Sequence, residues 1–365
     1  MRHADDLRTP VVTVQQAIME RNLARMAERA ASRGLALCPH IKTHKSTALA
    51  RRQMELGTAG IMVAKLGEAA VMLDAGLTDQ FIGYPLVGLQ QETRLRALIS
   101  QGLRPRVAVD SEAGIHLLAR VGEQSGVTIP ALIEIDTGFH RCGLEGVTAI
   151  RQLAGLIRAT GVPLQGITCF GGHIGHRTDP AEITRLVAAE NAMLAEIQDA
   201  LSADGYADLI VSQGGTVPAA YLDQISTATE IRPGTYIYND AAIVAAHAAT
   251  WEDCAAQVIT EVVSTPAADR AIIDAGAKTL AGDGPVSDSF GYVLERPDLK
   301  IERLSEEHGI IVRRDGGSTG LRIGDRLRII PNHVCTMMNL HDHVIVLNGE
   351  QVVSRLTLEA RGKVR

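Results

Sequence analysis

The stretch Leu35–Lys45, LALCPHIKTHK, places two lysines and two histidines directly after an apolar run. The run Leu35–Cys38 has the composition of a strand that is buried on both faces, and the titratable side chains follow it. A doubly wound sheet usually carries G-x-G-x-x-G in its first turn, but no such motif follows Leu35–Ile41. The stretch therefore favours a barrel, provided that the rest of the chain repeats the pattern.

The pattern of an apolar, β-rich run followed by polar residues recurs along the chain. The runs are 35–41, 60–64, 80–85, 106–110, 131–136, 166–170, 209–212 and 228–231. Helical spacing lies between them, as in 14–30, 68–75 and 183–201. Eight strands in about two hundred residues is the repeat count of a (β/α)₈ TIM barrel, so we predict this α/β fold for residues 12–248.

A different pattern begins near residue 250, where apolar segments alternate with turns and no long helix is indicated. These segments are 254–263, 270–274, 327–330, 343–347 and 351–356. Such spacing is typical of strands. We therefore predict a second, mostly β domain formed by residues 249–365 together with residues 1–11.

Composition excludes several classes of protein. Aromatic residues make up 3% of the chain, which argues against a stacking surface for single-stranded nucleic acid. The net charge is −6 with both signs scattered, so neither a nucleic-acid stripe nor a polybasic membrane patch is present. The N-terminus lacks the layout of a signal peptide, and five dispersed cysteines suit reduced thiols. A cytoplasmic protein without nucleic-acid or membrane partners is expected.

Polar side chains follow the predicted barrel strands, and in a barrel those positions share the C-terminal mouth where active sites lie. Lys42 is the most informative of them. A lysine held in a partly apolar mouth near Lys45, His40 or His44 has its ammonium form disfavoured, which lowers its pKa and frees a nucleophilic amine. Taken alone, the stretch fits a solvated loop lysine better.

Small and hydroxyl residues follow the last two barrel strands, at Gly214-Gly215-Thr216 and at Gly234-Thr235-Tyr236. These loops expose backbone N–H groups, and barrels commonly bind phosphate after strands seven and eight. A lysine after the first strand combined with this phosphate site is an arrangement for pyridoxal 5′-phosphate.

The chain resembles the fold type III pyridoxal-phosphate enzymes, in the branch of D-threonine aldolase and D-serine dehydratase, with alanine racemase a more distant relative. The similarity spans nearly the whole chain. Its motifs are PHIKTHK (39–45), DTGFHRCG (136–143), GH (172–173), GGT (214–216), RPGTY (232–236), PNHVC (331–335) and NLHD (339–342).

The resemblance implies a role for each matching residue. Lys42 is expected to hold the cofactor as an imine, Arg141 to bind its phenolic oxygen and Arg232 to face the pyridine nitrogen. The remaining residues expected near the cofactor are His40, His173, Gly214, Gly215, Thr216, Gly234, Thr235 and Tyr236. Whether Phe170 or His173 stacks on the ring stays open. Because a guanidinium keeps its proton, Arg232 leaves the ring nitrogen unprotonated, which weakens the electron sink.

His333 and Cys335 are two residues apart, so in an extended segment both point to one face and can share one ion. A buried cysteine beside a structural histidine is the alternative, but the family places a divalent metal here. Soft thiolate favours Zn²⁺, whereas a carboxylate at position 335 would favour Mn²⁺ or Mg²⁺.

The resemblance implies a lyase that acts on β-hydroxy-D-amino acids, and two reactions stay open. D-Threonine aldolase-like cleavage would give glycine and an aldehyde, while a D-serine or 3-hydroxy-D-aspartate dehydratase would release ammonia and a 2-oxo acid. Cys335 favours the dehydratase, and the segments 274–278 and 305–309 favour the aldolase group. Glu307 and His308 are candidate bases or metal neighbours, or a solvated turn. An amino-acid racemase is less favoured, and a homodimer is expected.

Overall fold

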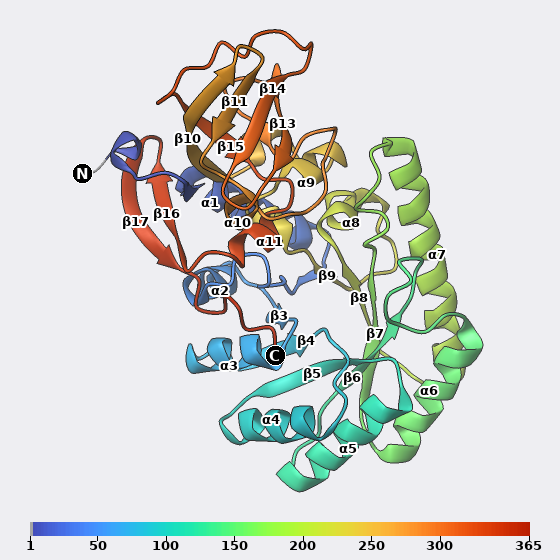
Figure 1. Ribbon diagram of the computed structural model, residues 1–365. Helices are drawn as coiled ribbons and strands as arrows, with labels where there is room; N and C mark the ends of the chain where they lie inside the picture. Colours follow the sequence, from blue (N-terminus) through green and yellow to red (C-terminus); the bar gives the residue numbers. More distant parts are fainter. Residues whose placement is uncertain (1–2) are drawn as a thin grey trace. The chain divides into compact units, whose positions relative to one another are not determined.

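The computed structural model describes residues 3–365, which divide into two compact units (Figure 1). The barrel unit contains residues 26–42, 47–234 and 363–365. The β unit contains the described residues up to 25, residues 43–46 and residues 235–362. The predicted domain limits follow the order of the chain, whereas each unit is assembled from several segments. Those limits therefore stay a prediction.

In the barrel unit, eight parallel strands form one sheet in the order β2-β9-β8-β7-β6-β5-β4-β3. They are β2 (Ala36–Leu37), β3 (Ile61–Val63), β4 (Asp79–Ile82), β5 (Arg104–Val109), β6 (Ala131–Ile135), β7 (Leu164–Phe170), β8 (Ile210–Gly214) and β9 (Glu230–Arg232). The sheet also closes on itself. The N–H of Ile41 donates to the Met62 carbonyl and the N–H of Met62 donates to the Pro39 carbonyl, both at 2.9 Å. The predicted (β/α)₈ barrel is thereby confirmed.

Helices follow the barrel strands, and Figure 1 shows α4 to α7 along the outside of the sheet. They are α2 (Thr47–Glu55), α3 (Leu66–Asp74), α4 (Leu89–Ser100), α5 (Glu112–Ser125), α6 (Val147–Thr160), α7 (Pro180–Ala203) and α8 (Thr216–Ala220), with the 3₁₀ turn η2 (Leu222–Gln224). A cluster of Cys38, Met62, Phe81, Ala108 and Leu132 fills the barrel interior. In residues 3–365, no helix combines the length and apolarity needed to span a membrane.

The β unit contains a nine-stranded sheet, most of it in the order β13-β14-β11-β10-β1-β16-β17. Its strands are β1 (Val11–Gln15), β10 (Ala256–Ala267), β11 (Arg270–Ile273), β12 (Tyr292–Val293), β13 (Leu299–Leu304), β14 (Gly309–Arg313), β15 (Arg326–Ile330), β16 (His343–Asn348) and β17 (Gln351–Thr357). Short helices are α9 (Ala241–Ala245), α10 (Ala277–Leu280) and α11 (Val334–Met338), with η1 (Ala4–Asp6), η3 (Thr235–Ile237) and η4 (Trp251–Asp253). The prediction of a second, mostly β domain is confirmed, while its predicted limits stay a prediction.

Two local predictions were wrong. Helical spacing was assigned from Val14, but Val11–Gln15 forms β1, which pairs with β10 and with β16. The helix α1 (Gln16–Ser32) begins only afterwards, because the β-branched run Val-Val-Thr-Val suits a strand between two partners. The segment 333–335 was assigned as extended, but α11 begins at Val334, so Cys335 is helical and only His333 is extended.

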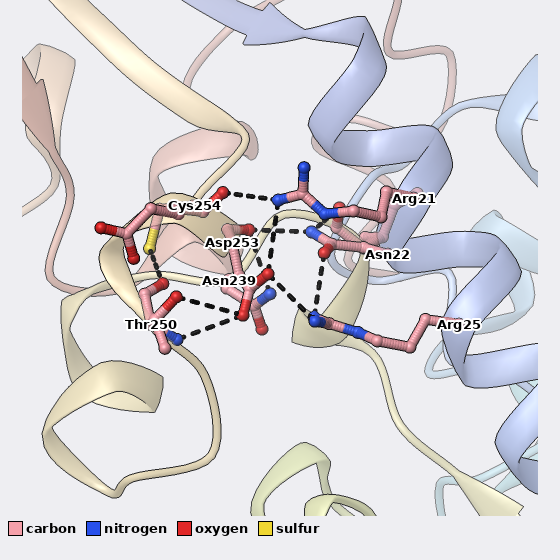
Figure 2. Close-up of polar contacts among 9 residues, drawn as sticks. Arg21, Asn22, Arg25, Asn239, Thr250, Asp253 and Cys254 are labelled. Carbon is pink, nitrogen blue, oxygen red and sulfur yellow. Dashed lines mark hydrogen bonds and ion pairs between the residues drawn. The ribbon is translucent and has the colours of Figure 1, made fainter.

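Polar contacts around the buried Asp253 link it to α1, and Figure 2 shows these contacts. Arg25 Nη1 lies 3.1 Å from Asp253 Oδ1, and Asn22 Nδ2 donates to the Asp253 carbonyl at 2.8 Å. The N–H of Thr250 donates to Asp253 Oδ2 at 3.2 Å. The carboxylate therefore links α1 to η4 by charge-assisted hydrogen bonds.

Candidate active site

Lys42 lies in the turn after β2, where His40 fixes its backbone. His40 Nδ1 accepts the N–H of Lys42 at 3.3 Å, and the N–H of His40 donates to the Pro233 carbonyl at 3.0 Å. The turn after β2 is thereby joined to the loop after β9. The Lys42 Nζ lies 5.3 Å from the centroid of the Phe170 ring, within range of a cation–π contact. The amine is therefore near the C-terminal end of β7.

Arg141 reaches the same ring. Its Cζ lies 4.8 Å from the Phe170 centroid and 5.3 Å from the centroid of Phe139, and the two rings meet edge to face at 5.4 Å. Arg141 Nη2 lies 3.9 Å from Glu134 Oε1. Burial raises the pKa of Glu134, and the attraction of Arg141 opposes that rise. The structure thus brings the predicted cofactor lysine and the predicted phenolate-binding arginine to one aromatic ring.

The loop that carries Arg141 is shaped by Asp136. Asp136 Oδ1 accepts the N–H groups of Gly138, Phe139 and His140 at 2.8, 2.9 and 3.0 Å. Although burial favours the neutral carboxyl, these donors hold the pKa of Asp136 below its usual value. A buried Asp at the end of β6 therefore sets the geometry of the whole DTGFHR loop.

The predicted phosphate site has the local structure that the loop sequence implies. Gly215 is the residue before α8 and has a φ of +117°. A Cβ at Gly215 would lie 3.0 Å from Pro218 Cδ. Among residues 3–365, the buried Thr216 hydroxyl has no hydrogen-bond partner. A left-handed glycine, the first N–H groups of a helix and an orphaned hydroxyl together fit a phosphate.

His173 packs against the Arg141 loop. Its Nε2 would lie 3.4 Å from a Cβ placed on Gly138, which has a φ of +120°. Burial lowers the pKa of His173, and its buried Nδ1 has no hydrogen-bond partner within the part of the chain that the structure describes. The ring is thus favoured in its neutral form. Of the two aromatic candidates left open, Phe170 is the one that the cations of Lys42 and Arg141 approach.

Arg232, the last residue of β9, is buried inside the barrel. Its guanidinium donates to Ser212 Oγ at 2.5 Å, to the Cys169 carbonyl at 2.7 Å and to Met62 Sδ at 3.3 Å. Burial lowers the pKa of Arg232, but a guanidinium stays charged in proteins. Its predicted position at the pyridine nitrogen stays a prediction.

In the β unit, His333 and Cys335 lie together although the segment is not extended. A hydrogen bond with Cys335 raises the pKa of His333 to about 9, against the opposing effect of burial. Cys335 Sγ also lies 3.1 Å from Thr43 Oγ1 and 3.6 Å from Thr235 Oγ1. An imidazole and a thiol in contact are a donor set that suits a divalent metal, Zn²⁺ above all.

Two carboxylates beside these donors were not predicted. Asp283 Oδ1 lies 3.5 Å from His333 Nδ1. Asp240 accepts the N–H of Val334 at 2.9 Å, and burial raises the pKa of Asp240 to about 6. Asp240 precedes α9 and is recognisable as a helix N-cap, whereas Asp283 lies in a Gly-Asp-Gly loop whose course the sequence does not indicate.

Two further groups of titratable residues are candidates. Glu307 and His308 are exposed in the turn between β13 and β14, and Glu307 pairs with Lys278 at 2.8 Å. Their predicted roles stay predictions. Asp136, His140 and Glu145 form a further group whose ligand atoms lie within 4.8 Å of one another. Asp136 Oδ1 already accepts three N–H groups there, so the loop itself accounts for the group.

Comparisons with known proteins agree with these features. The family "Alanine racemase, N-terminal domain" matches residues 14–242, and the family "Putative serine dehydratase domain" matches residues 255–347. D-Threonine aldolase of Arthrobacter sp is 31% identical over 97% of this chain and 93% of its own. D-threo-3-hydroxyaspartate dehydratase of Delftia sp. is 31% identical over 90% and 91% of the two chains.

A solved structure agrees over the whole length. The crystal structure of D-threonine aldolase from Filomicrobium marinum superposes with a TM-score of 0.90 at 32% identity, covering 100% of both chains. The chain therefore belongs to the fold type III family of enzymes that includes D-threonine aldolase and D-serine dehydratase, built on an alanine racemase-type barrel.

Proposed function

We propose that this enzyme is a pyridoxal-phosphate- and divalent-metal-dependent lyase that cleaves β-hydroxy-D-amino acids in the manner of a D-threonine aldolase. The observation that carries the proposal is the approach of Lys42 Nζ and Arg141 Cζ to the Phe170 ring, at 5.3 and 4.8 Å. Similarity to a D-threonine aldolase over 97% of the chain supports the reaction class.

Bound pyridoxal phosphate supplies an aldehyde that condenses with amines and a conjugated ring that withdraws electrons from Cα. Lys42 provides the amine that attaches the cofactor and yields its place to the substrate amino group. Arg141 donates to the phenolic oxygen and Arg232 to the pyridine nitrogen. The N–H groups at Gly214–Thr216 and at Gly234–Thr235 hold the phosphate, with Tyr236 beside them.

His333 and Cys335 hold the divalent metal, which supplies a Lewis acid for the substrate hydroxyl. Asp283 lies within 3.5 Å of His333 Nδ1, so it orients the imidazole and leaves Nε2 for the ion. Thr43, whose hydroxyl contacts Cys335 Sγ, directly follows Lys42. The segment Pro39–Lys45 thus carries both the cofactor lysine and a neighbour of the metal ligand.

In the aldolase reaction, a base removes the proton of the β-hydroxyl, the Cα–Cβ bond breaks, and Cα regains a proton to give glycine. Glu307 and His308 are the predicted bases for these proton transfers. Lys42 regains the cofactor when glycine leaves.

The second candidate is a dehydratase acting on D-serine or 3-hydroxy-D-aspartate. The thiol of Cys335 favours this candidate, and so does the similarity to the dehydratase of Delftia sp.. Here the released Lys42 amine removes the Cα proton, hydroxide leaves from Cβ, and hydrolysis of the enamine product gives a 2-oxo acid and ammonia. A racemase is less favoured for two reasons. It needs a second acid or base on the opposite face of the cofactor, and its reaction does not use a metal. We also propose a homodimer and a cytoplasmic location.

Incubation with D-threonine separates the reactions. We expect acetaldehyde and glycine in equal amounts, with loss of activity in a chelator and its return when Zn²⁺ or Mn²⁺ is added. Formation of 2-oxobutyrate and ammonia instead would establish the dehydratase. Lys42→Ala serves as the control that must abolish either product pair. Formation of L-allo-threonine, the product of inversion at Cα alone, in the presence of chelator would contradict both lyase assignments.

A further inference from the structure

A chain of polar contacts crosses the interior of the barrel from β5 to β9 and β8. Arg106 Nη2 donates to Glu230 Oε2 at 2.5 Å. Glu230 Oε1 accepts the Ser212 hydroxyl, and Ser212 Oγ accepts Arg232 Nη1 at 2.5 Å. The four side chains therefore form one continuous path, with two arginines at its ends and one carboxylate between them.

The path is buried, which makes its charges interact strongly. Ser212 is 0% exposed, Glu230 is 3% exposed and Arg232 is 5% exposed. The three partners of the Arg232 guanidinium, Ser212 Oγ, the Cys169 carbonyl and Met62 Sδ, are all uncharged. A buried guanidinium is costly without a counter-charge. The carboxylate of Glu230, one hydroxyl away, provides that charge.

The other end of the path, at Arg106, is partly exposed to solvent. Arg106 lines a cavity of about 660 Å³ at the N-terminal end of the strands, and Cys38 and Glu230 line it as well. The guanidinium of Arg106 lies 4.8 Å from the Phe81 centroid, and that of Arg232 lies 5.2 Å from the same centroid. Both guanidinium groups thus lie near one ring, and both act on Glu230, Arg106 directly and Arg232 through Ser212.

The N–H groups of Arg232 that make no contact within residues 3–365 indicate a role for these four side chains. A guanidinium has five N–H donors, and three contacts are made here, so two N–H groups are left for a ligand. The contacts to Ser212 and Cys169 fix the plane in which those two point. Glu134, whose carboxyl is also buried, interacts electrostatically with Arg232 as well.

We propose that Glu230, acting through Ser212, is a positioning residue that sets the orientation and electrostatic potential of Arg232, and that Arg106 opposes its charge. The inference rests on the proposed function, in which Arg232 meets the pyridine nitrogen. Glu230 itself touches neither cofactor nor substrate. Its effect on the reaction is electrostatic, so removal of either charge in the path must change the cofactor in a predictable direction.

The test is the pH titration of the visible absorbance of purified holoenzyme, which reports the pKa of the cofactor–lysine chromophore. Glu230→Gln removes a negative charge and lowers that pKa. Arg106→Gln removes a positive charge and raises it. A unit charge at about 10 Å in an effective dielectric of about 20 corresponds to a shift of about one pH unit. Glu230→Asp keeps the charge and restores most of the wild-type value.

Arg104→Gln is the matched control. Arg104 lies two positions before Arg106 on β5 and pairs with Asp79 in an exposed ion pair, so its loss leaves the chromophore pKa unchanged. Opposite shifts in Glu230→Gln and Arg106→Gln support the proposal. Shifts of the same sign would overturn the proposal, because loosened packing would move the chromophore pKa of both variants in the same direction. The absence of a shift in both variants would overturn it as well. If Glu230→Gln does not fold, the test uses the other two variants: the chromophore pKa must rise in Arg106→Gln and stay near the wild-type value in Glu230→Asp.

The two possible failures are distinguishable. Wild-type protein that develops no visible absorbance with pyridoxal phosphate would contradict the proposed function. Wild-type protein with normal absorbance, combined with variants that keep the same chromophore pKa, would contradict only the role of Glu230. A kinetic readout adds to this: a changed kcat for D-threonine with little change in KM is expected for both charge variants.

Discussion

Cys335 is the residue on which the predicted metal preference depends. Its sulfur lies beside the imidazole of His333 and two hydroxyls, in a helical turn and not in the extended segment that the sequence suggested. The side chains still converge, because His333 stands at the N-cap position and points back towards the first turn of α11. The two side chains are thus in contact although the backbone prediction was wrong, and their role as metal ligands stays a prediction.

We predict that Cys335→Ser weakens Zn²⁺ binding by more than about 100-fold. Mutation of residues that only orient a metal ligand already lowers the metal affinity by about 10- to 100-fold. Cys335→Asp should shift the preference towards Mn²⁺. Competition with a chromophoric chelator measures both constants. Cys142→Ser, a partly buried cysteine of the barrel unit, is the control with unchanged affinity. Unaltered Zn²⁺ affinity in Cys335→Ser would rule out the thiol as a ligand.

At the scale of elements, every barrel strand could be predicted from its apolar run, because parallel strands buried on both faces have a simple signature. The strands β12 to β14 were missed. The segment Leu299–Leu304, LKIERL, is half polar, and its alternation became meaningful only once β14 was available as its partner. The hydrogen bond of Arg232 to Ser212, and that of Ser212 to Glu230, were missed as well, since a polar residue within a strand gives no sign of which residue it contacts.

The start of α8 depends on a backbone conformation that favours glycine. We expect Gly215→Ala to raise the dissociation constant of pyridoxal phosphate about 10-fold or more, because a Cβ there meets Pro218 at 3.0 Å and strains a φ of +117°. Fluorescence titration with the cofactor measures the constant. Gly155→Ala, inside α6 with nothing within 4 Å of its Cβ, should bind normally. Equal affinity in the two variants would argue against a phosphate site at α8.

The link between α1 and η4 should give a pH-dependent stability. Burial raises the pKa of Asp253, but its bonds to Arg25, Thr250 and Arg21 outweigh burial and hold the pKa below its usual value. A depressed folded-state pKa adds stability above the unfolded pKa, about 3.9, and loses it as pH falls through the folded pKa.

Asp253→Asn should therefore lower the free energy of unfolding by about 1 to 3 kcal/mol at pH 7 and by less near pH 3. Urea unfolding at the two pH values gives both differences. Asp5→Asn, at an exposed aspartate, is the control and should change little at either pH. An equal loss at both pH values would show that packing, not charge, is responsible.

For the whole molecule, the family resemblance carried by short motifs gave the enzyme class, and the comparisons confirmed that class. Substrate and reaction could not be predicted in the same way. Relatives at 31% identity include both an aldolase and a dehydratase, so identity at this level does not select one reaction. The two proposed reactions differ in whether the hydroxyl proton or the Cα proton is removed, and the motifs do not encode this difference.

The central claim is that the amine of Lys42 binds the aldehyde of pyridoxal phosphate. The most direct measurement is borohydride reduction of the protein loaded with the cofactor, followed by peptide mass spectrometry. The account predicts one pyridoxyl group per chain, on Lys42, and none in Lys42→Ala. A pyridoxyl group on Lys45, on another lysine, or on none would contradict it.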